Sequence, residues 1–237
     1  CLIYGINEKK GFIAISGEIG TGKTTICRTL LSRLDESVRS ALIFNSAVSD
    51  LELLETINQE LGIAMPAGQR TKKTCIDALN AYLLQQFLQN KNVVVMIDEA
   101  QNLSHSTLEQ IRMLSNLETV EEKLIQIVLI GQPELQDLLT LPSLRQLNER
   151  ITLRYHIKSL DRRCVGEYIQ HRLAVAGGPE KADLLTRGAY SLIYAYSRGN
   201  PRRINAICDR AFLIAYSKNQ PKIDRRTVRA AVSDIGV

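Results

Sequence analysis

One short segment near the N-terminus has the residue types and spacing of a phosphate-binding loop. It reads Gly17-Glu18-Ile19-Gly20-Thr21-Gly22-Lys23-Thr24, is followed by Thr25, and matches G-x-x-x-x-G-K-[ST]. The glycines allow backbone N–H groups to turn inward toward phosphate oxygens, and a following helix would point its positive end at the same anion. Lys23 is expected to reach the β- and γ-phosphates, and the Thr24 hydroxyl to bind Mg²⁺. The segment therefore predicts a site for ATP with Mg²⁺.

Two adjacent carboxylates follow a continuous apolar run. The run is VVVMI at 93–97, and Asp98 and Glu99 come directly after it. Ligands of open α/β sheets bind at the carboxyl ends of the strands. Asp98 is expected to hold Mg²⁺ through water, because hard cations prefer oxygen ligands, and Glu99 to orient and polarise the attacking water. Alone, such a run is also typical of a strand that leaves the core; together with the upstream loop it predicts a Walker B motif.

Phosphoryl transfer also requires positive charge near the γ-phosphate, and three arginines are candidates. Arg145 and Arg150 lie just before the last predicted strand, from where an arginine can reach the nucleotide of a neighbouring subunit. The alternative for both is a solvated helix face. Arg202 follows a Gly-Asn-Pro segment at the start of a predicted helix, and its alternative is local pairing there.

Two amides complete the candidate set. Gln132 ends a predicted strand beside the Walker B strand, and its amide is placed to contact the γ-phosphate or the water. The alternative is a turn residue before Pro133. Asn45 ends the second predicted strand and is a candidate to hydrogen-bond and gate Glu99, although a capping asparagine is almost as well supported.

The elements that must position these residues form an alternating pattern. Apolar runs predict strands at 12–16, 41–44, 93–97, 124–130 and 151–156. Helical spacing predicts helices at 24–34, 51–61, 75–90 and 107–117. This alternation is typical of a doubly wound parallel sheet, so we expect an α/β nucleotide-binding domain over 1–157. Beyond it, helices are predicted at 162–176, 183–196, 201–217 and 225–235, which indicate a small all-helical domain over 158–237.

Composition narrows the class of protein. The 237 residues are 45% hydrophobic and 23% charged, which fits a globular protein and excludes a disordered one. The formal net charge of +5 is compatible with nucleotides, nucleic acid or a lipid surface and proves none of them. The five scattered cysteines exclude a disulfide framework, and no apolar run spans a membrane. Because the chain begins at Cys1 without a methionine, we expect it to be a fragment of a longer protein.

These motifs together resemble the AAA+ superfamily. Within it, they resemble the general secretion pathway protein A family of Gram-negative bacteria, with relatives in MSHA-type pilus biogenesis and exosortase-associated loci. The similarity lies in GFIAISGEIGTGKTT, VVVMIDEAQNL, IVLIGQPEL, LRQLNERI and SRGNPRRINAIC. Each motif alone is generic to AAA+ proteins, whereas the combination is typical of a much narrower group of proteins.

The resemblance implies a P-loop NTPase fold, with a five-stranded αβα core followed by a helical lid. It assigns Gln132 to the sensor 1 position, Arg202 to sensor 2, and Arg145 or Arg150 to the arginine finger. It implies a homo-oligomer with nucleotide between subunits, and a role in assembly of a secretion or pilus apparatus. It also implies a full-length protein anchored in the inner membrane outside this chain, with the ATPase facing the cytoplasm and an inner-membrane partner.

Two other functions remain open. One is an AAA+ regulator of DNA transposition that binds nucleic acid in an ATP-dependent way, which the basic charge mildly favours although no DNA-reading motif is present. The other is a binding module that uses ATP only as a conformational switch. Intact Lys23, Thr24, Asp98 and Glu99 argue against a site that cannot hydrolyse ATP.

Overall fold

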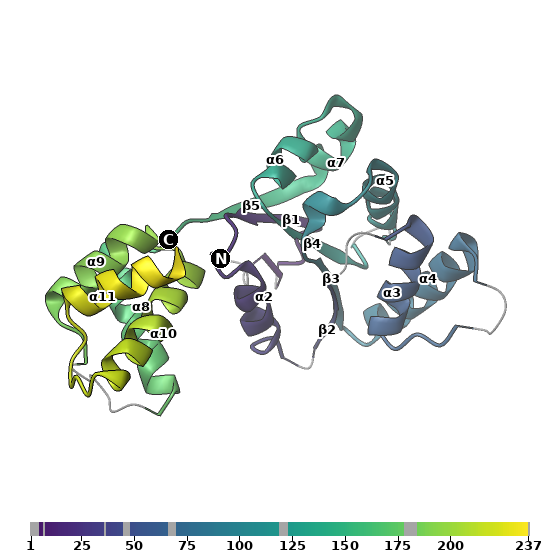
Figure 1. Cartoon of the computed structure of the whole chain (residues 1–237). Coiled ribbons are helices and arrows are strands. Elements are labelled where there is room, and N and C mark those ends of the chain that lie inside the picture. The colour runs from purple at the N-terminus through teal and green to yellow at the C-terminus, as the bar shows by residue number, and fades with distance from the viewer. Residues whose placement is uncertain are drawn as a thin grey trace. The chain divides into compact units, whose positions relative to one another are not determined.

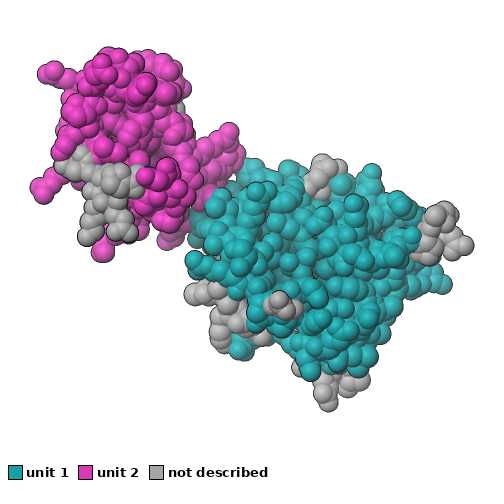
Figure 2. All heavy atoms as spheres, turned by 90° about the horizontal axis from the view of Figure 1, so that it is seen from below, with its two compact units in different colours: residues 1–17, 23–157 teal, residues 18–22, 158–237 magenta. Residues whose placement is uncertain are grey.

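The chain divides into two compact units. The computed structural model describes residues 5–6, 8–35, 37–44, 48–65, 70–118, 123–177 and 184–236. One unit comprises residues 1–17 and 23–157, and the other residues 18–22 and 158–237; Figure 2 colours them teal and magenta. Each unit has its own buried apolar core.

The first unit is built on a parallel sheet (Figure 1). Its strands are β1 (Phe12–Gly17), β2 (Val38–Ile43), β3 (Asn92–Ile97), β4 (Gln126–Gly131) and β5 (Ile151–Ile157). They lie in the order β2-β3-β4-β1-β5, and every pair is parallel. Every residue of β1 and β4 is buried, as expected for central strands that are covered on both faces.

The strand register brings three carboxyl ends to one edge of the sheet. Ser16 of β1 lies opposite Gly131 of β4, and Ile97 of β3 lies opposite Leu129 of β4. The segments that follow β1, β3 and β4 therefore begin side by side. This is the edge at which open α/β sheets bind their ligands.

Alternate strand residues face two different cores. On one face of the sheet, Met96 and the other strand residues of the same core pack with Cys27 and Leu30 of α2 (Lys23–Leu31). On the other face, Val95 and the other strand residues of its core pack against several helices. Those helices are α3 (Asp50–Glu60), α4 (Lys72–Leu88), α5 (His105–Leu114), α6 (Glu134–Leu139) and α7 (Arg145–Arg150). The sheet is thus the middle layer of three.

The second unit is helical. Its helices are α8 (Arg162–Val175), α9 (Arg187–Ser197), α10 (Pro201–Ser217) and α11 (Arg225–Ile235), which share one apolar core. The turn before α10 requires glycine, because Gly199 has φ +75° and an added Cβ would lie 1.8 Å from the Leu160 carbonyl oxygen. Within the described ranges, no helix has the length and apolarity that crossing a bilayer requires.

The predicted α/β class with a five-stranded parallel sheet is confirmed. Some boundaries differ. β2 begins at Val38 rather than at residue 41, because its first half is largely exposed and carries no apolar signal. Helices α6 and α7 and the 3₁₀ turns η1 (Ala100–Asn102) and η2 (Pro142–Leu144) were not predicted. Each is six residues or shorter, which is too short for helical periodicity to show.

Candidate functional site

The loop between β1 and α2 has the backbone conformation that its glycines predict. Gly20 has φ +81° and Gly22 has φ +90°, a region in which glycine is not strained. The loop folds onto itself, since the Thr21 hydroxyl donates to the Glu18 carbonyl oxygen at 2.8 Å. Helix α2 begins directly at Lys23. Positive-φ glycines followed by a helix N-terminus are the backbone features of an anion-binding loop.

Side chains of the two predicted motifs meet at this edge of the sheet. The Thr24 hydroxyl donates a hydrogen bond to Asp98 Oδ2, across 74 residues of sequence. The Lys23 ammonium donates to the Gly17 carbonyl oxygen at 2.6 Å. Lys23 and Asp98 are only 6% and 3% exposed, so both charges are held inside the protein. Buried charges persist where they are paired and hydrogen-bonded.

Glu99 occupies an unusual backbone conformation. Its φ of 52° and ψ of 36° lie in the left-handed region, which non-glycine residues rarely adopt. The Asp98 carboxylate accepts the Glu99 N–H at 2.9 Å, and the Glu99 carbonyl accepts the Asn102 N–H at 2.9 Å. Strained backbone of this kind concentrates at functional sites.

Two glutamine amides bind the Glu99 carboxylate. Gln101 Nε2 donates to Glu99 Oε2 at 2.6 Å, and Gln132 Nε2 donates to the same oxygen at 3.1 Å. Chiefly the hydrogen bond from Gln101, then that from Gln132 and the charge of Lys23, hold the pKa of Glu99 below its usual range despite partial burial. Glu99 is therefore a carboxylate at neutral pH.

A second polar cluster supports the end of β1. Ser16 is 2% exposed, and its hydroxyl lies 3.0 Å from His156 Nδ1 and accepts a hydrogen bond from Gln136 Nε2. None of these three residues was among the candidates that the sequence offered. Since Ser16 directly precedes Gly17, this cluster fixes the strand end from which the loop departs.

The two finger candidates have different environments. The side chain of Arg145 is 80% exposed and, among the residues that the structure describes, it forms an ion pair with Glu149, four residues on, at 2.8 Å. Arg150 instead donates to the Arg112 carbonyl oxygen at 3.3 Å and to the Ser115 hydroxyl, at the C-terminal end of α5. Cations are stabilised at helix C-termini, so Arg150 has a structural partner in its own chain.

Arg202 lies beside the loop within the second unit. Its N–H donates to the Gly20 carbonyl oxygen at 3.2 Å, and a Cβ added to Gly20 would lie 2.7 Å from the Cβ of Arg202. Asn200 caps α10 by accepting the N–H of Arg202 at 3.1 Å, and its own amide donates to the Ile19 carbonyl oxygen at 2.7 Å. The Gly-Asn-Pro segment thus holds the start of α10 against the loop.

Asn45 lies outside the described residues. Gln101 was not predicted, although it contacts Glu99 directly. Its only signal in the sequence is a polar side chain two residues after Glu99, at a sheet edge where such side chains converge.

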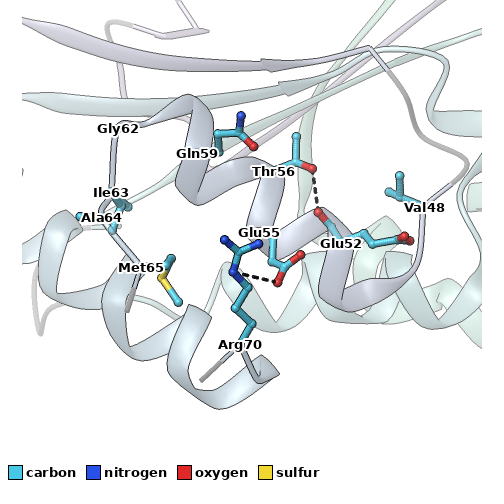
Figure 3. A pocket seen from close by; sticks show the side chains of 10 residues that line it. All are labelled: Val48, Glu52, Glu55, Thr56, Gln59, Gly62, Ile63, Ala64, Met65 and Arg70. Carbon is cyan, nitrogen blue, oxygen red and sulfur yellow. Dashed lines mark hydrogen bonds and ion pairs between the residues drawn. The ribbon is translucent and has the colours of Figure 1, made fainter. Parts of the chain in front are cut away.

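A separate pocket lies elsewhere in the first unit. Its volume is about 620 Å³. Its lining residues belong to α3 and to neighbouring segments (Figure 3). Its charged side chains are engaged locally: Glu52 accepts the Ser49 N–H at 2.8 Å, and Glu55 lies 4.0 Å from Arg70 Nε. None of the ten residues labelled in Figure 3 belongs to the predicted nucleotide site.

The side chains at the sheet edge fit a magnesium–triphosphate group. The Thr24 hydroxyl and the Asp98 carboxylate present adjacent oxygens, the ligands that Mg²⁺ prefers. The loop supplies N–H groups and the Lys23 ammonium for anionic oxygens. A carboxylate, Glu99, follows Asp98 in the chain. The arrangement has the chemistry for phosphoryl transfer to water.

Comparison with known proteins agrees with this chemistry. The AAA domain family matches residues 6–139, which is more than half of the chain. General secretion pathway protein A of Aeromonas hydrophila is 41% identical over 234 residues, which cover 99% of this chain and 42% of that protein. The chain therefore spans less than half of the length of this relative.

Solved structures share the fold at low sequence identity. Cdc6p of Pyrobaculum aerophilum has a TM-score of 0.76 and 17% identity, and the match covers 98% of this chain and 64% of the Cdc6p chain. The ORC2 protein of Aeropyrum pernix, in ADPNP–ADP complexes, has a TM-score of 0.70 and 18% identity, with coverage of 98% and 64%. The RuvB Holliday junction branch migration motor of Thermotoga maritima has a TM-score of 0.66 and 15% identity, with coverage of 98% and 66%.

The family match, the parallel sheet and the loop that joins β1 to α2 lead to one assignment. This chain belongs to the AAA domain family of P-loop nucleotide-binding proteins and is related to General secretion pathway protein A.

Proposed function

We propose that this chain binds ATP with Mg²⁺ and hydrolyses it, and that the resulting conformational change serves the assembly of a bacterial secretion or pilus apparatus. The observation that carries the first part is the contact between Thr24 of the loop and Asp98 at the end of β3. Residues 1–157 act as the nucleotide-binding domain in this proposal, and residues 158–237 as a helical lid.

The candidate residues of the loop and of the strand ends have distinct roles in this proposal. When bound, ATP and Mg²⁺ supply the transferable phosphoryl group and the cation that offsets its charge. The loop N–H groups from Gly17 to Thr25 and the Lys23 ammonium hold phosphate oxygens. Thr24 and Asp98 hold the cation. Glu99 orients the attacking water and accepts its proton, while Gln132 and Arg202 contact the γ-phosphate.

Arg145 is the better candidate for an arginine that acts on a neighbouring subunit. It is exposed, and its ion pair with Glu149 lies at the surface, where such a pair contributes little to stability and is readily exchanged for another anion. Arg150 is instead hydrogen-bonded to the C-terminal end of α5 in its own chain. The proposal therefore includes a homo-oligomer with nucleotide at its subunit interfaces.

The proposed cellular setting rests on the relative. Its name, General secretion pathway protein A, supports secretion over transposition. We place this domain at the cytoplasmic face of the bacterial inner membrane, with an inner-membrane partner and an anchor outside this chain. Export of extracellular proteins should stop when Glu99→Gln is introduced into the protein in its own cell. ATP-dependent, salt-sensitive retention of DNA would instead favour the transposition regulator.

The hydrolytic function is tested by Glu99→Gln. The substitution keeps the side-chain size but removes the base, so turnover should fall by at least about 100-fold. ATP affinity should stay within about twofold, because Glu99 serves the water and not the phosphate. Steady-state phosphate release and equilibrium ATP binding measure the two effects. The exposed Glu60→Gln, at the end of α3, is the matched control, and unchanged turnover in Glu99→Gln would remove Glu99 from this role.

A further inference from the structure

A short turn after β3 returns the chain toward Glu99. Glu99 has a left-handed backbone conformation, and the 3₁₀ turn η1 follows it immediately. The Glu99 carbonyl accepts the Asn102 N–H at 2.9 Å, and Ala100 is fully buried. This turn, anchored by Ala100, places the side chain of Gln101 beside the carboxylate that is two residues earlier.

Gln101 has partners in the segments that follow two different strands, β3 and β4. Its Nε2 donates to Glu99 Oε2 at 2.6 Å, and its Oε1 accepts the backbone N–H of Gln132 at 3.0 Å. The Gln132 side chain donates to the same Glu99 oxygen at 3.1 Å. The three residues therefore form a closed ring of hydrogen bonds between the end of β3 and the end of β4.

The ring depends on a glycine at the end of β4. A Cβ added to Gly131 would lie 2.7 Å from Gln101 Oε1 and 2.9 Å from the Cβ of Leu135. A contact under 3 Å would force the Gln101 side chain away from the β4 backbone. The space at Gly131 is what lets Gln101 reach the Gln132 N–H.

We propose that Gln101 is a positioning residue for ATP hydrolysis, which holds the Glu99 carboxylate in one orientation and ties it to the end of β4. The inference rests on the proposed function, in which Glu99 orients the attacking water. A glutamate side chain rotates about several bonds, so its catalytic geometry must be fixed by neighbours that are themselves held in place. Gln101 is held by the backbone of Gln132, and any displacement of Gln132 is transmitted to Glu99.

Turnover separates this role from a structural one. Gln101→Ala should lower kcat by about tenfold or more, because a misoriented carboxylate loses catalytic efficiency. The KM for ATP and the affinity for ADP should stay within about twofold, since no nucleotide contact is removed. The control is Asn102→Ala, an exposed neighbour in the same 3₁₀ turn, which should behave as the wild type.

Gln101→Glu identifies which hydrogen bond matters. The substituted side chain keeps its length and can still accept the Gln132 N–H, but it cannot donate to Glu99 when ionised. Positioning through Glu99 predicts a kcat as low as that of Gln101→Ala. A wild-type kcat in Gln101→Glu would show that Gln101 matters only for local structure and would overturn the proposal, as would a wild-type kcat in Gln101→Ala.

A nucleotide-free measurement tests the same contact without any hydrolysis. Urea unfolding of Gln101→Ala, Glu99→Ala and the double variant should be non-additive, with the unfolding constants departing from the product by about fivefold. Additive effects would contradict the proposed hold of Gln101 on the Glu99 carboxylate. This result holds even if the wild type proves inactive, so failure of the ATPase proposal and failure of the Gln101 proposal are distinguishable.

Discussion

At the scale of single residues, the candidate site joins side chains that are remote in sequence. Thr24 and Asp98 are 74 residues apart and share a hydrogen bond, while Asp98 itself is 3% exposed. A buried carboxylate needs partners, and a hydroxyl on one of its oxygens is a partner that a divalent cation can share. The pair is therefore where the proposed dependence of ATP binding on magnesium would arise.

Thr24→Val tests that origin. Valine keeps the branched shape and removes the oxygen, so the gain in ATP affinity that Mg²⁺ produces should fall by at least about tenfold. Thr24→Ser, which retains the hydroxyl, should keep the gain. ATP titrations with Mg²⁺ and with EDTA measure it, and a full magnesium effect in Thr24→Val would remove Thr24 from the ligand set.

The sequence predicted best which residues belong to the site. It predicted least well which hydrogen bonds join them. Lys23, Thr24, Asp98 and Glu99 belong to patterns with fixed spacing, so each was expected from the sequence. Gln101 was not, because its role comes from the Gln132 N–H, 31 residues away, and from the space at Gly131. Contacts between neighbouring strands leave no fixed spacing in the chain.

At the scale of elements, Asp50 connects three helices on one face of the sheet. It lies at the start of α3, and its carboxylate accepts hydrogen bonds from Lys72 of α4 at 2.8 Å and from Thr107 of α5 at 2.9 Å. The bond from Lys72, followed by those from Thr107 and Ser106, holds the pKa of Asp50 below its usual range. Ionised Asp50 thus stabilises the packing of these helices.

Asp50→Asn should lower the free energy of unfolding by about 2 kcal/mol at pH 7. Little of this comes from Lys72, which is 53% exposed. Because the folded pKa is depressed, the stabilisation is present above the pKa of the unfolded chain and is lost as the pH falls through the folded value. Urea unfolding at several pH values should show a constant difference at neutral pH that shrinks below about pH 4. A difference that is independent of pH would contradict the assignment.

The predictability of elements followed their length. The apolar runs of β3 and β4 and the periodic helices α3, α4 and α10 carry strong signals, because burial of a full strand or a helix face dictates the residue types. Helices α6 and α7 have six residues each and bury only a few side chains. Their stability comes from contacts with the core around Leu135 and Leu147, which local sequence does not record.

At the scale of the whole molecule, the proposed arginine finger of one subunit acts on the nucleotide of another. Subunits with Arg145→Ala keep an intact nucleotide site and lack the proposed finger, whereas subunits with Lys23→Ala keep the finger and lack the site. Arg145→Ala alone should lose about 10³-fold in turnover. The exposed Arg163, which pairs with Glu167 four residues on in the same way, provides the matched control Arg163→Ala.

A mixture of these two variants should regain activity that neither has alone, because each supplies what the other lacks. Turnover as a function of mixing ratio measures this complementation. A mixture whose activity equals the sum of its parts, or a fully active Arg145→Ala, would exclude Arg145 as a finger that acts across subunits.

The proposed function depends first on the segment from Gly17 to Thr24, which would bind the phosphates of ATP. Equilibrium titration of Mg·ATP into the wild type, Lys23→Ala and the exposed control Lys73→Ala tests it most directly. Lys23→Ala should weaken binding by at least about 100-fold, or about 2.7 kcal/mol, while Lys73→Ala should bind as the wild type does. Near-normal affinity in Lys23→Ala would contradict it.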